Sequence, residues 1–148
     1  MSKATGTESV GLFHASYRIG ESRPGGKLFT LDLVVDTPTK RINGLGRITQ
    51  AVSPPLDIPT TLQGNYSQLP TLPPAPSLLL VVLTGYPPIH WPPHGGIGPV
   101  IPPNVELRMT LTPDWKSGTA SYRYLDDKGQ WHEVEAAPVT LIAPALAA

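Results

Sequence analysis

The chain has 148 residues, the size of one domain, because domains commonly hold roughly 100–200 residues. Basic and acidic residues balance at 11 each, which argues against nucleic-acid binding, since phosphate contacts normally need a basic surplus. The absence of cysteine excludes disulfides, thiol catalysis and cysteine-ligated metals, and the 19 prolines and 14 glycines disfavour a helical protein.

The sequence contains no segment typical of targeting or membrane insertion. Residues 1–8 lack the apolar stretch of a signal peptide, and the longest apolar run, residues 78–83, is far shorter than the ~20 residues of a membrane-spanning helix. We therefore expect a soluble cytoplasmic protein with no membrane span. Export by a route that leaves no N-terminal signal is the alternative.

Apolar residues recur at every second position along much of the chain, the pattern of strands with one buried face. The alternation is clearest in residues 29–36 and 105–111, where Val105, Leu107 and Met109 are separated by polar residues. In chain order, the predicted strands are residues 10–19, 29–36, 41–50, 58–67, 78–83, 105–111, 119–125, 130–135 and 139–142.

Short turn sequences join these strands. Residues 36–40 contain Pro38, which presets a turn, and residues 114–118 and 126–129 end in a glycine that suits a hairpin loop. Residues 104–135 therefore predict a three-stranded antiparallel meander. We expect an all-β protein whose meander closes into a small barrel of about 8–9 strands, because closure removes unpaired edges. A β-sandwich is the alternative.

We expect one domain over residues 10–143, with tails at residues 1–9 and 144–148. Within it, residues 86–103 form a Pro/Gly-rich loop of 18 residues, seven of them proline. So many prolines exclude a regular sheet ladder, and loops of this length in compact domains are often functional. Prolines also stiffen a loop, which lowers the entropy lost when a partner binds.

The side chains of this loop favour binding over metal coordination or catalysis. His90 and His94 flank Trp91 and two prolines, which exclude a helix and place the histidines ~12 Å apart in polyproline II geometry. Since common zinc sites need three or four protein ligands, we predict neither a metal nor any other cofactor. Tyr86 and Trp91 suit recognition of a protein, peptide or sugar, and Trp91 is also a candidate plug for one end of the barrel.

Two segments carry a resemblance to a known family. Residues 83–100, which include the Tyr-Pro-Pro-Ile-His-Trp-Pro-Pro-His motif, and residues 115–124 resemble a family of small uncharacterised bacterial proteins, a domain of unknown function. The likeness extends from about Gly11 to Leu141. It implies a bacterial source and a single domain, and it supplies no activity or site residue. A looser architectural likeness is to calycin-type barrels, and such analogy does not establish function.

The apolar segment 78–83 predicts self-association. Leu79, Val81 and Leu83 share one face, and the intervening residues of the segment share the other. A barrel strand buries one face in the core, so the second face must be covered by the proline-rich flanks or by another copy. We assign Leu79, Val81 and Leu83 to the surface of a homo-oligomer.

Three functions remain as hypotheses. The first is a non-enzymatic domain that binds a partner through Tyr86, His90, Trp91 and His94. The second is a self-associating structural subunit of a homo-oligomer or filament. The third is a small-molecule isomerase or cyclase in the barrel mouth, with Tyr86, His90 or His94 as acid or base. It ranks last because no convergent set of titratable residues is apparent.

Overall fold

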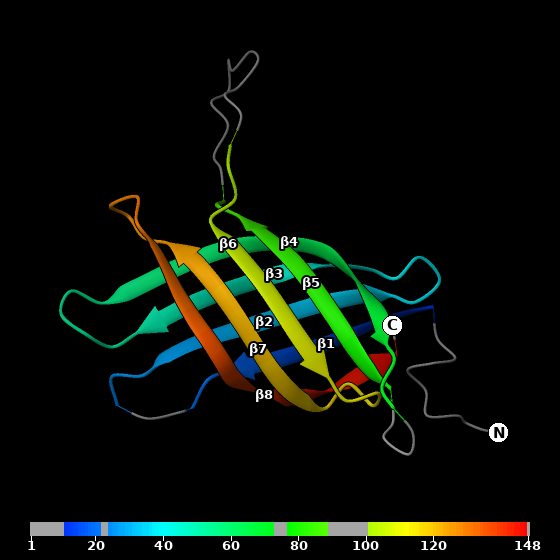
Figure 1. Cartoon of the computed structure of the whole chain (residues 1–148). Helices are drawn as coiled ribbons and strands as arrows, with labels where there is room; N and C mark the ends of the chain where they lie inside the picture. The colour runs from blue at the N-terminus through cyan, green and yellow to red at the C-terminus, as the bar shows by residue number, and fades with distance from the viewer. Residues whose placement is uncertain (1–10, 22–23, 73–76, 89–100, 148) are drawn as a thin grey trace, which may run out of the picture.

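The protein is a closed barrel of eight antiparallel strands in up-and-down order, in which each strand pairs with the next and β8 pairs with β1 (Figure 1). The computed structural model describes residues 11–21, 24–72, 77–88 and 101–147. The strands are β1 (Leu12–Ile19), β2 (Lys27–Asp36), β3 (Arg41–Gln50), β4 (Leu56–Leu69), β5 (Leu78–Tyr86), β6 (Val105–Leu111), β7 (Ser117–Leu125) and β8 (Trp131–Ala147).

The predicted all-β fold and the closed meander are confirmed, and the sandwich alternative is not found. The described residues form no helix, so they include no helix long and apolar enough to span a membrane. One difference lies at the C-terminal end, where the two predicted strands 130–135 and 139–142 are the single strand β8. β8 also extends to Ala147, which pairs with Phe13, so residues 144–147 are strand rather than tail.

The alternation of side chains places an apolar core inside the barrel. In β2, for example, Phe29, Leu31 and Leu33 are almost fully buried, whereas Thr30 and Asp32 face the outside. The largest fully buried side chains come from seven of the strands and are Tyr17, Tyr124, Phe13, Phe29, Ile19, Leu31, Leu33, Ile42, Ile48, Leu62, Leu83 and Met109. The inside of the barrel is therefore packed with the protein's own side chains.

Inward-facing glycines allow the strands to coil tightly around this core. A β-carbon added at Gly44, Gly64 or Gly118 would overlap a backbone carbonyl oxygen of the neighbouring strand. Each of the three glycines is paired with an inward-facing leucine on that strand, in the pairs Leu33–Gly44, Gly64–Leu83 and Leu111–Gly118. Such alternation of small and large residues lets the interior of a narrow barrel fill without overlap.

The strand directions define two ends of the barrel. We call the end that carries the connections 20–26, 51–55, 87–104 and 126–130 the loop end, and the opposite end the Trp115 end. Trp115 is 5% exposed and closes its end of the barrel from the β6–β7 turn. Its ring packs edge-on against Phe13 and Tyr66, at centroid distances of 5.2 Å and 4.9 Å.

A buried hydrogen bond fixes the Trp115 end of the barrel. At the Trp115 end, the buried Tyr17 hydroxyl donates to the backbone carbonyl of Trp115 at 2.8 Å.

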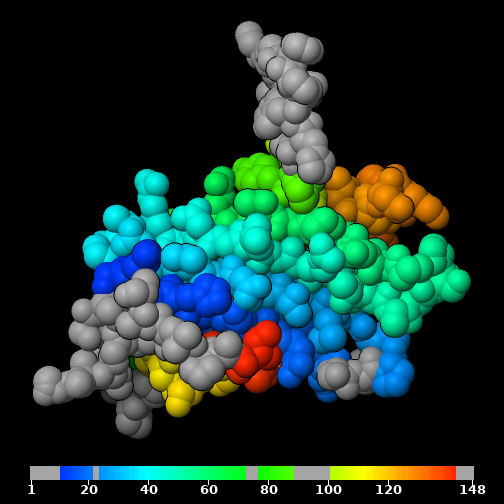
Figure 2. Space-filling view, turned by 180° about the vertical axis from the view of Figure 1, so that it is seen from behind, coloured from blue at the N-terminus to red at the C-terminus, as the bar shows by residue number. Residues whose placement is uncertain are grey.

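Figure 2 shows the opposite side of the molecule from Figure 1, where β1 to β4 form a continuous outer wall. The described part of the barrel therefore offers its outer wall and its loop end, rather than its interior, for recognition.

Candidate functional site

The loop end gathers the described residues that flank the 86–103 segment. Tyr86, the last residue of β5, is half-buried. The other loop residues predicted to bind a partner lie outside the described residues; they are His90, Trp91 and His94. The prediction that Trp91 plugs one end of the barrel therefore also concerns a residue outside the described ones. The residue that closes a barrel end within the described chain is Trp115.

Asn104 anchors the returning end of this loop. Its side chain is 8% exposed, accepts a hydrogen bond from the Thr60 hydroxyl at 2.8 Å, and donates to the carbonyl of Pro59 at 3.2 Å. Its backbone joins both neighbours, because its N–H donates to Gly85 and its carbonyl accepts from Leu125. The chain that enters β6 is therefore fixed to β4, β5 and β7.

An exposed aromatic side chain lies two strands beyond this anchor. Trp131, the first residue of β8, is 40% exposed, and the guanidinium of Arg123 lies 4.6 Å from its ring centroid. Glu106 holds that guanidinium by accepting hydrogen bonds from Nε at 3.1 Å and from Nη2 at 3.3 Å. A surface ion pair of this kind adds less than about 1 kcal/mol of stability, so its main effect is to orient Arg123 over the ring.

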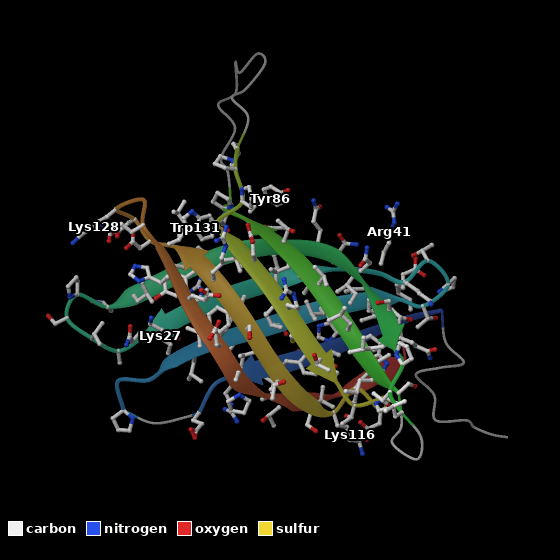
Figure 3. The ribbon with its side chains drawn as sticks, in the orientation of Figure 1. Lys27, Arg41, Tyr86, Lys116, Lys128 and Trp131 are labelled. Atoms are coloured by element: carbon white, nitrogen blue, oxygen red, sulfur yellow. The ribbon has the colours of Figure 1, made fainter. Side chains whose placement is uncertain are left out.

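Tyr86 and Trp131 lie at the same end of the barrel (Figure 3). Leu125 pairs with Trp131, and Asn104 bonds to Gly85 and to Leu125, so these residues follow one another across β5 to β8. Three strand spacings of ~4.8 Å separate the backbones of Tyr86 and Trp131 by roughly 14 Å. We call Tyr86, Glu106, Arg123 and Trp131 the aromatic surface.

The β7–β8 hairpin is stabilised by one carboxylate. Asp126 accepts hydrogen bonds from the backbone N–H groups of Lys128 and Gln130, within the turn predicted for residues 126–129. His132 Nε2 lies 2.7 Å from Asp126 Oδ2, and this contact and the two backbone donors hold the pKa of Asp126 below its ordinary value. The Tyr124 ring stacks on the imidazole of His132, with 5.1 Å between the two ring centroids.

The predicted self-association residues lie inside the barrel. Leu79, Val81 and Leu83 are 6%, 0% and 1% exposed, because β5 turns these positions toward the core. They therefore form no part of the outer surface, and our assignment of the two faces of β5 is corrected. The outward face carries Leu78, Leu80 and Val82, of which Val82 is 42% exposed.

The histidines in the described chain do not converge. His14 lies on β1 opposite Leu146, near the Trp115 end, whereas His132 lies at the loop end of β8. Within the described ranges, no three side chains of the metal-ligating types histidine, cysteine, aspartate and glutamate lie together.

Sequence reasoning missed several residues that shape the loop end. Arg123 and Asn104 gave no signal, because their partners Trp131 and Thr60 become neighbours only through strand pairing and barrel closure. Trp131 did give a signal, since it shares a predicted strand face with Glu133 and Glu135, and all three are exposed as that alternation predicts.

Comparison with known proteins identifies the family. No curated protein matches the chain. A family model described as a domain of unknown function, DUF1842, matches residues 10–131, from just before β1 to the first residue of β8. Because this match covers most of the chain, the protein belongs to the DUF1842 family.

Proposed function

We propose that the protein is a non-enzymatic binding domain that recognises a partner protein or peptide at the loop end. The recognition surface consists of the aromatic surface together with His90, Trp91 and His94 of the adjoining loop. The observation that carries the proposal is the exposed Trp131 ring with Arg123 held over it by Glu106. Tryptophan, tyrosine and arginine are the residues most enriched where proteins bind one another.

Two further features support this proposal. The barrel interior is filled by apolar side chains, so the residues that face a partner are those of the outer wall and ends. The bonds that Asn104 makes to β4, β5 and β7 give the loop a rigid base beside Tyr86. A rigid base lowers the ordering cost of binding.

The test is selection of a displayed library of random peptides on the native protein. We expect the selected peptides to bind Trp131→Ser and Tyr86→Ser variants at least about tenfold more weakly, because each change removes an aromatic anchor. Leu45→Ser is the matched control, since Leu45 is an apolar residue on the outer face of β3 that is 62% exposed. Its binding should equal that of the native protein.

Two results would contradict the proposal. One is a set of selected peptides that bind the aromatic-surface variants and the native protein equally. The other is failure of peptide selection combined with a glycan array in which binding depends on Trp131, which would assign the surface to carbohydrate.

A second candidate function, homo-oligomerisation, rests on a different surface. Leu69 and Leu78 pair across β4 and β5, and Leu69, Leu72 and Val82 are 39%, 87% and 42% exposed. Leaving such side chains in water costs several kcal/mol in total, at ~1.5–3 kcal/mol for full burial of one. With a formal net charge of zero, copies of the chain experience no long-range repulsion.

Mass measurement in solution tests this second candidate. We expect the native chain to be larger than a monomer at high micromolar concentration, and Val82→Lys to reduce its mass by placing a charge in the interface. Val34→Lys is the control, because Val34 is 39% exposed on β2, away from β5. A monomeric native chain, or equal effects of both lysines, would rule out an interface at β5.

A further inference from the structure

A hollow of about 440 Å³ opens at the loop end of the barrel and shares no residue with the aromatic surface. It lies between the described ends of the β1–β2 connection, residues 20–21 and 25–26, the end of β3 and the middle of β8. The residues that matter to its chemistry are Lys27, Gln50, Tyr122, Glu135 and Glu21. Its volume falls within the ~300–1,000 Å³ of sites that bind small molecules.

A bulge in β8 forms one wall of the hollow. Ala120 pairs with Ala137 and Tyr122 pairs with Val134, so β8 has two residues, Glu135 and Ala136, opposite one residue of β7. Ala136 has a φ of 56°, a conformation that residues other than glycine rarely adopt. Bulges and strained residues of this kind concentrate at barrel rims and binding sites.

Tyr122 lines the hollow beside this bulge. Tyr122 is 3% exposed, and its ring is turned inward onto Phe29 at 4.9 Å. Unlike Tyr17, whose hydroxyl donates to Trp115, it makes no hydrogen bond to a described residue. No fully buried side-chain oxygen or nitrogen in the described chain lacks a partner, so the Tyr122 hydroxyl must reach open space.

The Tyr122 hydroxyl keeps its proton and can therefore donate a hydrogen bond at neutral pH. Burial, with a smaller contribution from Tyr124, raises the pKa of Tyr122 to about 12, so it stays protonated at neutral pH. A protonated phenol beside a cavity donates to carboxylate or carbonyl oxygens.

Charges of both signs surround this donor. The ammonium of Lys27 lies 5.0 Å from the Tyr124 ring centroid and forms no ion pair with a described residue. Glu21 and Glu135 line the same hollow, and both are exposed carboxylates without a described ion-pair partner. Among the described residues that line the hollow, one cation and two carboxylates disfavour a purely anionic ligand and suit a molecule that carries both charges.

We propose that this hollow binds a small zwitterion of amino-acid size. The carboxylate of the ligand pairs with Lys27 and accepts a hydrogen bond from the Tyr122 hydroxyl, and its ammonium group faces Glu135 or Glu21. This site is separate from the aromatic surface and does not depend on the partner-binding function proposed above.

The test uses the 20 standard amino acids, each titrated alone into the native protein and followed by calorimetry or ligand-detected NMR. We expect saturable binding of at least one of them, weakened about tenfold or more by Tyr122→Phe and by Lys27→Met, since each change removes a bond to a charged group. Tyr66→Phe, at the Trp115 end, is the matched control and should bind as the native protein does. Far-UV circular dichroism and thermal unfolding verify that all variants fold.

Derivatives of the best ligand test its two charges separately. Its methyl ester lacks the carboxylate and its N-acetyl form lacks the ammonium group, so both should bind more weakly than the parent. The proposal is overturned if no amino acid binds saturably up to about 10 mM. It is equally overturned if binding survives unchanged in both Tyr122→Phe and Lys27→Met, or if the N-acetyl form binds as tightly as the parent.

Discussion

A side chain at Gly44 would have to occupy space that already holds the carbonyl oxygen of Asp32, and it would approach the Cα of Leu33 to 2.9 Å. The backbone of β2 cannot move away without breaking its pairing with β3. Glycine is required here by the close approach of two strands, since Gly44 does not have a positive φ. Gly129 is required for the other reason, because its φ is 81° while nothing lies within 4 Å of an added β-carbon.

Alanine substitutions separate these two reasons. We expect Gly44→Ala to lower the free energy of unfolding by about 3 kcal/mol, because overpacking against backbone cannot relax through a rotamer change. Gly129→Ala should cost only about 1 kcal/mol, the penalty of a left-handed conformation in an open turn. Urea titrations measure both values, and equal losses would show that β2 and β3 do not approach each other so closely.

At the scale of secondary-structure elements, the amide side chain of Asn104 fixes the end of the β5–β6 connection to β4. The Asn104 side chain joins the start of β6 to Thr60 and Pro59 of β4, and its backbone N–H donates to Gly85 of β5. Because Thr60 is 2% exposed, its hydroxyl has little access to water if this partner is removed. A buried hydroxyl that loses its best partner is costly.

We therefore expect Asn104→Ala to lower the free energy of unfolding by about 1–3 kcal/mol. Asn43→Ala on the exposed face of β3 is the control, with an expected change within about 0.5 kcal/mol. Denaturant unfolding measures both variants. Similar small effects would mean that the loop base does not depend on Asn104.

The sequence predicts elements well where alternation is strict and poorly where it stops. Residues 105–111 alternate without exception, and β6 has those bounds. The sequence pattern predicts two strands where the structure has the single strand β8. The bulge at Ala136 shifts by one residue which positions face inward, and this shift interrupts the alternation.

The sequence also does not show which face of β5 is buried, or that Trp115 closes one end of the barrel. Both faces of residues 78–83 are apolar, so period-two alternation gives no direction, and only barrel closure turns Val81 inward. Trp115 lies in a polar turn, and its contacts with Phe13 and Tyr66 join residues far apart in the chain. Long-range contacts of this kind leave no local pattern.

At the scale of the whole molecule, the functional regions are distributed over the outside of a filled barrel. The aromatic surface and the hollow share the loop end, and both include residues of β7 and β8, but they have no residue in common. The exposed apolar residues Leu69 and Val82 lie on β4 and β5. The effects of variants in the aromatic surface, in the hollow and at Leu69 or Val82 on binding should therefore be independent of one another.

Within the part of the chain that the structure describes, the pairing of β1 with β8 is the only strand pairing that joins distant parts of the sequence. Every other pair is a hairpin or a sequential neighbour, so seven strands can assemble one after another as the chain grows. Until β8 arrives, β1 keeps an unsatisfied row of backbone donors and acceptors. In an incompletely folded chain, that edge fits the β8 of another copy as well as its own, so exchange of β8 between chains is the misassembly to which this topology is most exposed.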